Sequence, residues 1–571
     1  MKKRRIITSV IASMMAFSSV SMAACGTKKP GGEGVDKNRI QLYVGFYEGG
    51  WGREWMDYLK TEFEKQYPGV QVMLTGKKYE YESDLLISSF KDGVNDMYFT
   101  NIYSHDYVRN GDLLLDVTDV VTTPLNEVFA SEITLKDGTK VAAANQAAFE
   151  KETKSIEEKM DADMRTYYKS SSLDGTKYYG IPHSGSTMNL NYDVDLFENQ
   201  SFYISSYDAD AEEYVWTSGL AGQPKKWAGQ DGIEGTYDDG LPVTYEDFKA
   251  LCREIDSAGC VPLTYGKTMS QYRESYLAGV WANYVGADEF ALGYSQSGHS
   301  EELDIDITAD NAYRLQESEG KKAMLTLAYD FVKNGWLSAN TKTDTFTEAQ
   351  NNFINSKYYA EKGAGKRIAM ILEGSWWENE AKATLEGNKT SGRETSDRRF
   401  GVMTLPQFKG TSGIADQTST DKTVVVMSSD VGIYIKKNTE RAEIAKKFMA
   451  FAILDANLRE TTRLTGEVKP YDYQLTTEDL SSMSYYKQAN WDNLKGAGVV
   501  RTRKEGPSNL MKNNRAYFYY EWVCEAKSTN GGDWTDPFRF FGTTANSGKS
   551  VDDYWNALKT YHANNWSKLA K

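Results

Sequence analysis

A carboxyl group and two indole rings lie within five residues of one another, at Glu373, Trp376 and Trp377. Indole rings offer flat apolar faces, and a carboxylate forms charge-assisted hydrogen bonds with hydroxyl groups. Sugars present apolar C–H faces surrounded by hydroxyls, so this combination of residue types is suited to binding a sugar. The same residue types also occur in protein cores, and a core position is the alternative for each ring taken singly.

The residues around the two tryptophans predict where the rings lie. Ile368 to Leu372 form a short apolar run that is typical of a strand covered on both faces in an α/β protein. Gly374 permits a sharp exit from this strand, and Ser375 with Glu378 has the spacing of a helix capping box. The ring pair is therefore expected at the edge where open α/β sheets bind ligands. Because adjacent helical residues point about 100° apart, at least one ring is expected to face a cleft.

A second set of candidate binding residues lies near the start of the chain. Residues 40–74 predict a strand, a helix and a second strand, in the order of a right-handed βαβ unit. This order places Tyr47, Glu48 and Trp51 at the carboxyl edge of the sheet, where ligands bind.

The segment from Gly229 to Pro242 carries four acidic residues and four glycines. Glycines permit a tight path, and carboxylates supply the hard oxygen ligands that Ca²⁺ prefers. The segment resembles the Asp-Gly-x-x-Gly-Thr-x-Asp-Asp-Gly calcium loops of other secreted bacterial proteins, although it lacks the spacing of an EF-hand. A structural Ca²⁺ is therefore one hypothesis, and a solvated acidic turn is the alternative. The candidate ligands are Asp231, Glu234, Asp238 and Asp239.

Catalytic patterns are weak in this sequence. The histidines match no metal-ligand or triad spacing, since they are scattered at positions 105, 183, 299 and 562. Residues 363–367 resemble a phosphate-binding loop only superficially, because no Ser or Thr follows Lys366. Paired acidic residues are frequent, so a surface glycoside hydrolase is an alternative, but the sequence singles out no catalytic pair. We expect a binding protein that has no catalytic activity and requires no cofactor.

The N-terminus predicts export. Four basic residues precede the apolar run from Ile6 to Ala24, as in a secretion signal, and this run is too short and too rich in serine for a membrane span. The sequence Met22-Ala-Ala-Cys25 resembles the lipobox of bacterial lipoproteins, in which the cysteine carries diacylglycerol, although Met22 stands where leucine is usual. We expect residues 1–24 to be a signal peptide and residues 25–38 a flexible tether, lipidated at Cys25, on the extracellular face of the membrane. Ordinary secretion is the alternative.

Composition limits the possible partners and the number of domains. The chain has 66 basic and 80 acidic residues, and removing the four basic residues of the signal leaves 62 against 80, a formal charge of −18. Such a surface repels nucleic acid and anionic lipid. The three remaining cysteines do not suggest a disulfide framework, and Cys252 and Cys260 are either paired or buried thiols. The length predicts at least two lobes.

Several motifs occur in an order that resembles a known family. They are the opening βαβ unit, the loop Asn110-Gly-Asp-Leu-Leu-Leu-Asp-Val-Thr-Asp119, the segment Tyr179-Gly-Ile-Pro182 before residues 190–197, the Gly374-Ser-Trp-Trp stretch, the strand 431–435 with its following helix, and Thr465-Gly-Glu-Val-Lys-Pro470. Together they resemble the extracellular solute-binding lipoproteins of ABC importers, in the carbohydrate class that includes maltose-binding protein. The resemblance covers residues 38 to 475.

The resemblance implies an α/β fold of the type II periplasmic-binding-protein kind, with two lobes joined by hinge strands near Pro182, Arg367 and Tyr434. It assigns residues 39–180 and 367–433 to the first lobe, and residues 181–366 and 434–571 to the second, the last of these with a C-terminal extension. Residues 126–172 and 475–571 exceed the family's minimal length and are expected to decorate the lobes.

The resemblance also implies a function. We expect a monomeric, lipid-anchored receptor that binds a carbohydrate, most simply an oligosaccharide, and delivers it to ABC permease subunits. A glycan-binding surface protein without transport is a further alternative. The expected ligand-binding residues are Tyr47, Glu48, Trp51, Asp106, Trp281, Glu373, Trp376 and Trp377, of which we expect about half to touch the ligand.

Overall fold

The computed structural model describes residues 34–77, 83–101, 111–135, 138–170, 176–208, 213–216, 225–394, 397–428, 431–504, 517–527 and 535–569. The predicted signal peptide, the lipidation site Cys25 and the candidate ligand residue Asp106 lie outside these ranges. Among the described residues, no helix is long and apolar enough to cross a membrane.

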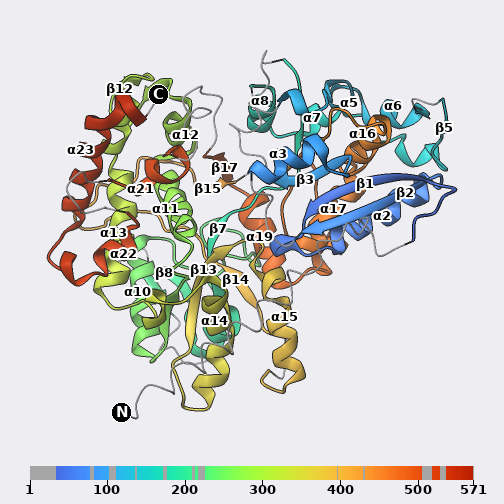
Figure 1. The fold of residues 1–571 in the computed structure, drawn as a ribbon. Coiled ribbons are helices and arrows are strands. Elements are labelled where there is room, and N and C mark those ends of the chain that lie inside the picture. Colours follow the sequence, from blue (N-terminus) through green and yellow to red (C-terminus); the bar gives the residue numbers. More distant parts are fainter. Residues whose placement is uncertain are drawn as a thin grey trace, which may run out of the picture.

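The molecule has two lobes, each built on its own sheet, which confirms the predicted fold class (Figure 1). The first lobe carries a five-stranded sheet in the order β2-β1-β3-β16-β6, in which β1 pairs in parallel with β2 and β3 and β16 pairs antiparallel to β3 and β6. Its strands are β1 (Ile40–Tyr47), β2 (Val70–Lys77), β3 (Met97–Asn101), β6 (Ile181–Pro182) and β16 (Val431–Ile435). Its helices are α2 (Glu54–Gln66), α3 (Ser83–Asp92), α5 (Thr118–Thr122), α6 (Leu125–Ala130), α7 (Ile156–Lys159), α8 (Ala162–Ser170), α16 (Ala442–Phe451) and α17 (Asp455–Thr465).

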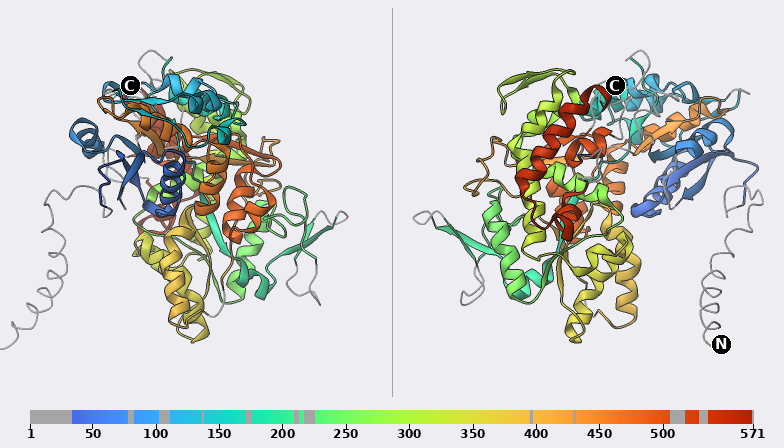
Figure 2. Two further views of the ribbon diagram at one scale, coloured as in Figure 1. Left: turned by 90° about the vertical axis from the view of Figure 1, so that its right-hand side faces the viewer. Right: turned by 60° about the vertical axis from the view of Figure 1, so that its left-hand side comes forward.

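The second lobe carries a four-stranded sheet in the order β10-β13-β7-β14. Its strands are β7 (Met188–Asp193), β10 (Val261–Thr264), β13 (Ile368–Gly374) and β14 (Phe400–Val402), and the hairpin β8 (Ile204–Asp208) and β9 (Glu213–Trp216) projects from this lobe (Figure 2). Its helices are α9 (Val194–Gln200), α10 (Tyr245–Ser257), α11 (Ser270–Val285), α12 (Ala287–Ser295), α13 (Glu319–Lys333), α14 (Phe346–Glu361), α15 (Trp377–Thr390), α21 (Trp522–Cys524), α22 (Pro537–Phe541) and α23 (Val551–Leu569).

The chain passes between the lobes at places that differ in part from the predicted hinges. It first crosses between β6 and β7, next to Pro182 as expected. It returns between β15 (Thr423–Met427) and β16, where Ser428 pairs with Ser186 of the first crossing segment. A third connection runs through α19 (Tyr485–Lys495) and β17 (Val499–Arg503), and β17 pairs with β15. The hinge predicted at Arg367 is wrong, because this guanidinium is anchored inside the second lobe by the buried Asp193 carboxylate at 2.7 Å.

The lobe assignment of two segments also needs correction. Strand β13 pairs with β7 and β10, so most of residues 367–433 belongs to the second lobe rather than the first. Strand β16 and helices α16 and α17 pack in the core of the first lobe, although residues 434–571 had been assigned to the second. The C-terminal helices do pack in the second lobe, as expected. The family motifs gave the order of the elements, but pairing between strands far apart in sequence decides which sheet each strand joins.

Local signals predicted several of the helices and strands. Helix α10 begins with a capping box of the Thr-x-x-Asp spacing, in which Thr244 and Asp247 exchange hydrogen bonds with each other's backbone N–H groups. Strand β13 is buried along its whole length, as its apolar run suggested. Helix α15, however, is not capped by Ser375, because its N-cap residue is Trp376 and makes no side-chain cap. The cysteines Cys252, Cys260 and Cys524 are buried free thiols.

Candidate functional site

The two adjacent tryptophans occupy different environments. Trp377 is fully buried and packs against Phe353, Phe400 and Tyr486 in a core of the second lobe. Trp376 is only partly buried and packs against the apolar core of the first lobe, although it belongs to the second. Of the two rings, Trp376 is therefore the one that lies where the lobes meet, and the expectation that a ring faces a ligand-binding cleft stays a prediction.

Trp376 lies between elements of both lobes. On one side it covers Gly50, in the short helix Gly49–Trp51 of the first lobe, closely enough that a Cβ atom at position 50 would lie 2.3 Å from its Cδ1 atom. On the other side its ring meets Tyr272 of α11 edge to face, with 5.7 Å between ring centroids. We call the region where β13 and α15 meet the helix Gly49–Trp51 and residues 465–471 the interlobe seam.

The residues predicted after the first strand reach this seam in part. Trp51 is buried, with Tyr47 edge-on at 5.8 Å between ring centroids and the imidazole of His183 at 6.3 Å. His183 lies on the first crossing segment, so Trp51 faces the junction of the lobes. Glu48 stands next to this helix, and its carboxylate lies 3.8 Å from Arg53.

Glu373, at the end of β13, is a buried carboxyl group in the seam. The amide of Gln350 donates hydrogen bonds to Glu373 at 3.3 Å and to Glu380 at 2.9 Å. Burial, together with the nearby Glu380 carboxylate, raises the pKa of Glu373 well above its ordinary value. Burial also raises the pKa of Glu380. A carboxyl group accepts hydrogen bonds in either protonation state and also donates one when it is protonated, so both groups can pair with hydroxyl groups.

A second buried carboxyl group connects the lobes directly. The hydroxyl of Ser375 donates a hydrogen bond to Oε1 of Glu467 at 2.8 Å and accepts one from the backbone N–H of Thr187 at 3.3 Å. Burial raises the pKa of Glu467 to about 7, against the opposing effects of Ser375, Lys469 and Trp51. Burial lowers the pKa of Lys469 to about 8. Ser375 thus serves the contact between the lobes instead of capping a helix.

Several polar atoms along the seam are buried and have no hydrogen-bond partner among the described residues. They are Nε2 of His183, Oγ of Ser184, Oγ1 of Thr187 and Oε2 of Glu373. Burial, with the charge of Lys469, holds the pKa of His183 well below its ordinary value, so the imidazole is neutral. Buried polar groups in native proteins are rarely left without partners.

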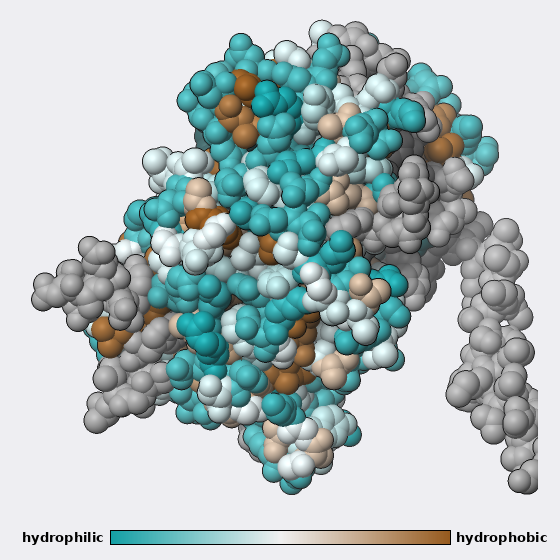
Figure 3. Space-filling view, turned by 90° about the vertical axis from the view of Figure 1, so that its left-hand side faces the viewer, coloured by the Kyte–Doolittle hydropathy of each residue, from teal (hydrophilic) through white to brown (hydrophobic). Residues whose placement is uncertain are grey.

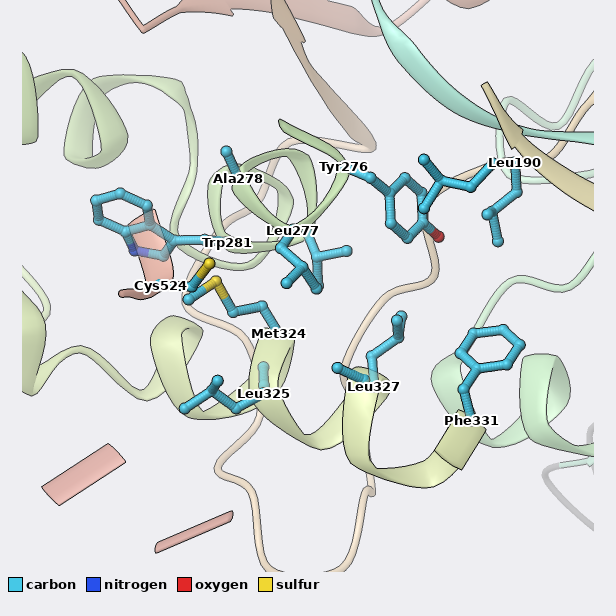
Figure 4. Packing of buried hydrophobic residues seen from close by; sticks show 14 of the residues in the cluster. Leu190, Tyr276, Leu277, Ala278, Trp281, Met324, Leu325, Leu327, Phe331 and Cys524 are labelled. Atoms are coloured by element: carbon cyan, nitrogen blue, oxygen red, sulfur yellow. The ribbon is translucent and has the colours of Figure 1, made fainter. Parts of the chain in front are cut away.

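One predicted binding residue does not belong to this site. Trp281 is 1 % exposed and packs beside Cys524 and Met324 in the core of the second lobe (Figure 4). The ammonium group of Lys321 lies 3.7 Å from its ring centroid. The prediction for Trp281 is therefore wrong, because α12, α13 and α21 surround α11 and leave it no ligand-facing side at this position.

The acidic loop is held together by its own hydrogen bonds. The carboxylate of Asp238 accepts hydrogen bonds from the N–H of Asp231 at 3.1 Å and the hydroxyl of Thr236 at 2.7 Å. Asp239 accepts one from the N–H of Gly235 at 2.7 Å, and Glu234 forms an exposed ion pair with Lys225. Within the described part of the chain, no group of three or more acidic, histidine or cysteine side chains is arranged to hold a metal ion. The calcium hypothesis stays a prediction.

Sequence reasoning missed several groups of the seam. The pair Glu467 and Lys469 stands within one of the motifs that carried the family resemblance, and that position could have marked these two charged residues. His183 and Thr187 follow the predicted crossing at Pro182, so their position next to both lobes was accessible from the sequence. Gln350 and Tyr272 carry no local signal, since they approach the seam only through tertiary packing.

Comparison with known proteins agrees with this architecture. A family model of bacterial extracellular solute-binding proteins matches residues 59–472. No curated protein is significantly similar to the chain in sequence.

Solved structures share the fold. The apo form of RafE from Streptococcus pneumoniae is similar with a TM-score of 0.51 and 12 % identity, over 93 % of this chain and 98 % of that one. The cyclic α-maltosyl-1,6-maltose binding protein from Arthrobacter globiformis is similar with a TM-score of 0.50 and 12 % identity, over 92 % of this chain and 99 % of that one. Since the family match spans most of the chain and the two-lobed fold agrees with it, the chain belongs to the bacterial extracellular solute-binding proteins.

Proposed function

We propose that the protein is a lipid-anchored receptor that binds an oligosaccharide between its lobes and delivers it to the permease of an ABC importer. The observation that carries the proposal is the interlobe seam, where the Trp376 ring stands beside buried hydroxyl, imidazole and carboxyl groups that lack partners among the described residues. Aromatic faces bind the C–H surfaces of a sugar, and the polar groups bind its hydroxyls.

The charge state of the seam supports a neutral, hydroxylated ligand. The carboxyl groups of Glu373 and Glu380 have raised pKa values, and the His183 imidazole is neutral. Glu467 and Lys469 have pKa values of about 7 and about 8, so their opposite charges offset each other near neutral pH. The seam therefore holds both donors and acceptors, and the hydroxyl groups of a ligand can pair with either kind. The Arthrobacter relative is named for binding a cyclic maltosaccharide, which agrees with this ligand class.

The protein itself can identify the ligand. Mass spectrometry of the natively purified chain should reveal a co-purified oligosaccharide, and calorimetry should then give saturable binding of the same sugar. Small-angle scattering should show contraction when that sugar is added. A ligand that contacts both lobes binds the closed form more tightly than the open form, and this difference in affinity shifts the population toward the closed form.

Two outcomes would overturn the proposal. Release of reducing sugar from the bound oligosaccharide would show a hydrolase instead of a receptor. Tight sugar binding with an unchanged radius of gyration would favour a rigid glycan-binding surface protein. Deletion of adjacent permease genes should abolish uptake of the sugar while leaving its binding intact, which separates transport from binding alone.

A further inference from the structure

A cavity lies in the second lobe, away from the interlobe seam. Its volume is about 660 Å³, and it is enclosed by the end of α13, the connection 335–342 and the C-terminal residues 536–547. None of its lining residues belongs to the seam. Pockets of this size hold small organic ligands of one or two rings. Residues of the C-terminal extension thus form part of the cavity wall.

The wall of the cavity is built from apolar groups and a fixed ion pair. Tyr265, Phe538 and Phe541 are buried residues of this wall, and the guanidinium of Arg273 lies 4.6 Å from the Tyr265 ring centroid. Arg273 is itself buried, donates through Nε to Asp536 at 2.9 Å and through Nη1 to the carbonyl of Gly266 at 2.7 Å. The ion pair therefore ties the C-terminal extension to α11 and keeps the wall in place.

The rim of the cavity is positively charged. Lys267, Lys342 and Arg539 line it, are exposed, and have no carboxylate within 4.0 Å in the part of the chain that the structure describes. Lys333 also lines the cavity and donates to the carbonyl of Ser547 at 2.8 Å. The carboxyl group in the lining is that of Asp536, whose charge Arg273 already balances. These three cations and Lys333 surround one cavity in a chain that has more acidic residues, 80, than basic residues, 66. Their combined charge favours the binding of an anion.

The surroundings indicate a small ligand and not a protein partner. The side of the second lobe that carries α13, α22 and α23 is mainly hydrophilic, and its apolar patches are small (Figure 3). Stable protein interfaces have an apolar centre, and this face shows only small apolar patches (Figure 3). The hydroxyl groups of Thr544 and Ser547 add hydrogen-bonding capacity to the cavity itself.

We propose that this cavity is a second ligand site that binds an acidic sugar of one or two rings, such as a uronate. The carboxylate would meet Lys342, Lys267 or Arg539, the ring would lie against the apolar wall, and the ring hydroxyls would meet Thr544 and Ser547. The site does not depend on the function proposed for the seam.

Calorimetry with the full chain and digalacturonate tests the site. We expect saturable binding that falls on the order of tenfold in the double variant Lys342→Glu/Arg539→Glu, because charge reversal replaces attraction by repulsion. The matched control is Lys366→Glu/Lys409→Glu, which makes the same charge change at exposed lysines elsewhere on the second lobe and should bind as wild type. Trp376→Ala should also leave this binding unchanged, which separates the cavity from the seam.

Each opposing result excludes one part of the proposal. Absence of digalacturonate binding, or equal binding by both double variants, would overturn the site. Equal binding of a neutral digalactoside would overturn the role of the cations. Equal binding of benzoate would overturn the carbohydrate class.

Discussion

The indole of Trp376 lies so close to Gly50 that a Cβ atom at position 50 would stand 2.3 Å from its Cδ1 atom. The two residues come from different lobes, so the absence of a side chain at Gly50 determines how closely the lobes meet at this ring. Gly50 does not have a positive φ, so alanine can adopt its backbone conformation without strain. An effect of alanine at this position therefore reports the lack of space next to the Trp376 ring.

Gly50→Ala should push the Trp376 ring out of its position. Crowding of this kind typically costs about 1–3 kcal/mol, so sugar affinity should fall by on the order of tenfold or more. Calorimetry measures the affinity. Gly387→Ala is the control, because a Cβ atom there meets nothing within 4 Å and alanine favours the helix. Unchanged affinity in Gly50→Ala would mean that the lobes do not close around this ring.

The adjacent tryptophans should respond differently to truncation. Trp376→Ala should weaken sugar binding by about 2 kcal/mol, as loss of an aromatic anchor does, with little change in melting temperature. Trp377→Ala should destabilise the fold by roughly 3–5 kcal/mol, because its ring is fully buried. Thermal melting and calorimetry together distinguish the two effects. If Trp376→Ala binds the sugar normally, the ligand does not use this ring.

Calcium should stabilise the acidic loop if the loop is a metal site. Burial, together with repulsion from the nearby carboxylates of Asp231 and Asp238, raises the pKa of Asp492 to about 6. A cation bound near these three carboxyl groups would relieve that repulsion. A metal that binds the folded state raises the melting temperature by mass action, and chelator lowers it. Asp231→Asn should abolish the calcium response. Identical melting curves with calcium and with chelator would identify the loop as a solvated turn.

The sequence predicted the fold better than it predicted the site. Strand β13 and helix α10 were predictable because burial on both faces and a capping box are local patterns. The lobe that β13 joins was not predictable, since its partners β7 and β10 are distant in sequence. Trp281 shows the same limit, because its burial depends on a C-terminal extension that packs around α11. The sequence predicted that Trp376 and Trp377 point in different directions, because adjacent helical residues lie about 100° apart. It could not predict which of the two rings is buried in the core.

Lipid anchoring at Cys25 is a prediction from the lipobox-like sequence, since this residue lies outside the described structure. A single acyl chain binds membranes reversibly, whereas two acyl chains give stable attachment. Cys25→Ser should therefore release the protein into the medium, as fractionation of cells and medium would show. Cys252→Ser is the control, because this buried thiol lies in the second lobe. Retention of Cys25→Ser on cells would contradict lipidation at this residue.

Glu467 should make the stability of the protein depend on pH between about 4.5 and 7. Burial raises its pKa from 4.5 to about 7, so within this window the folded state holds a proton that the unfolded state has lost. The stabilisation from this group is thus complete below pH 4.5 and is lost as the pH rises through 7.

Glu467→Gln removes this titration. Between pH 4.5 and pH 7.5, the free energy of unfolding of the wild type should fall relative to that of the variant. The fall should be at most about 3 kcal/mol, since each pKa unit corresponds to about 1.36 kcal/mol. The pKa of about 7 already includes the effect of the nearby Lys469 ammonium, which favours the carboxylate. Urea unfolding at both pH values gives the difference. Glu301→Gln, at an exposed position, should show no such trend relative to wild type. A difference between wild type and Glu467→Gln that does not change with pH would show that Glu467 titrates at its ordinary pKa in the folded protein.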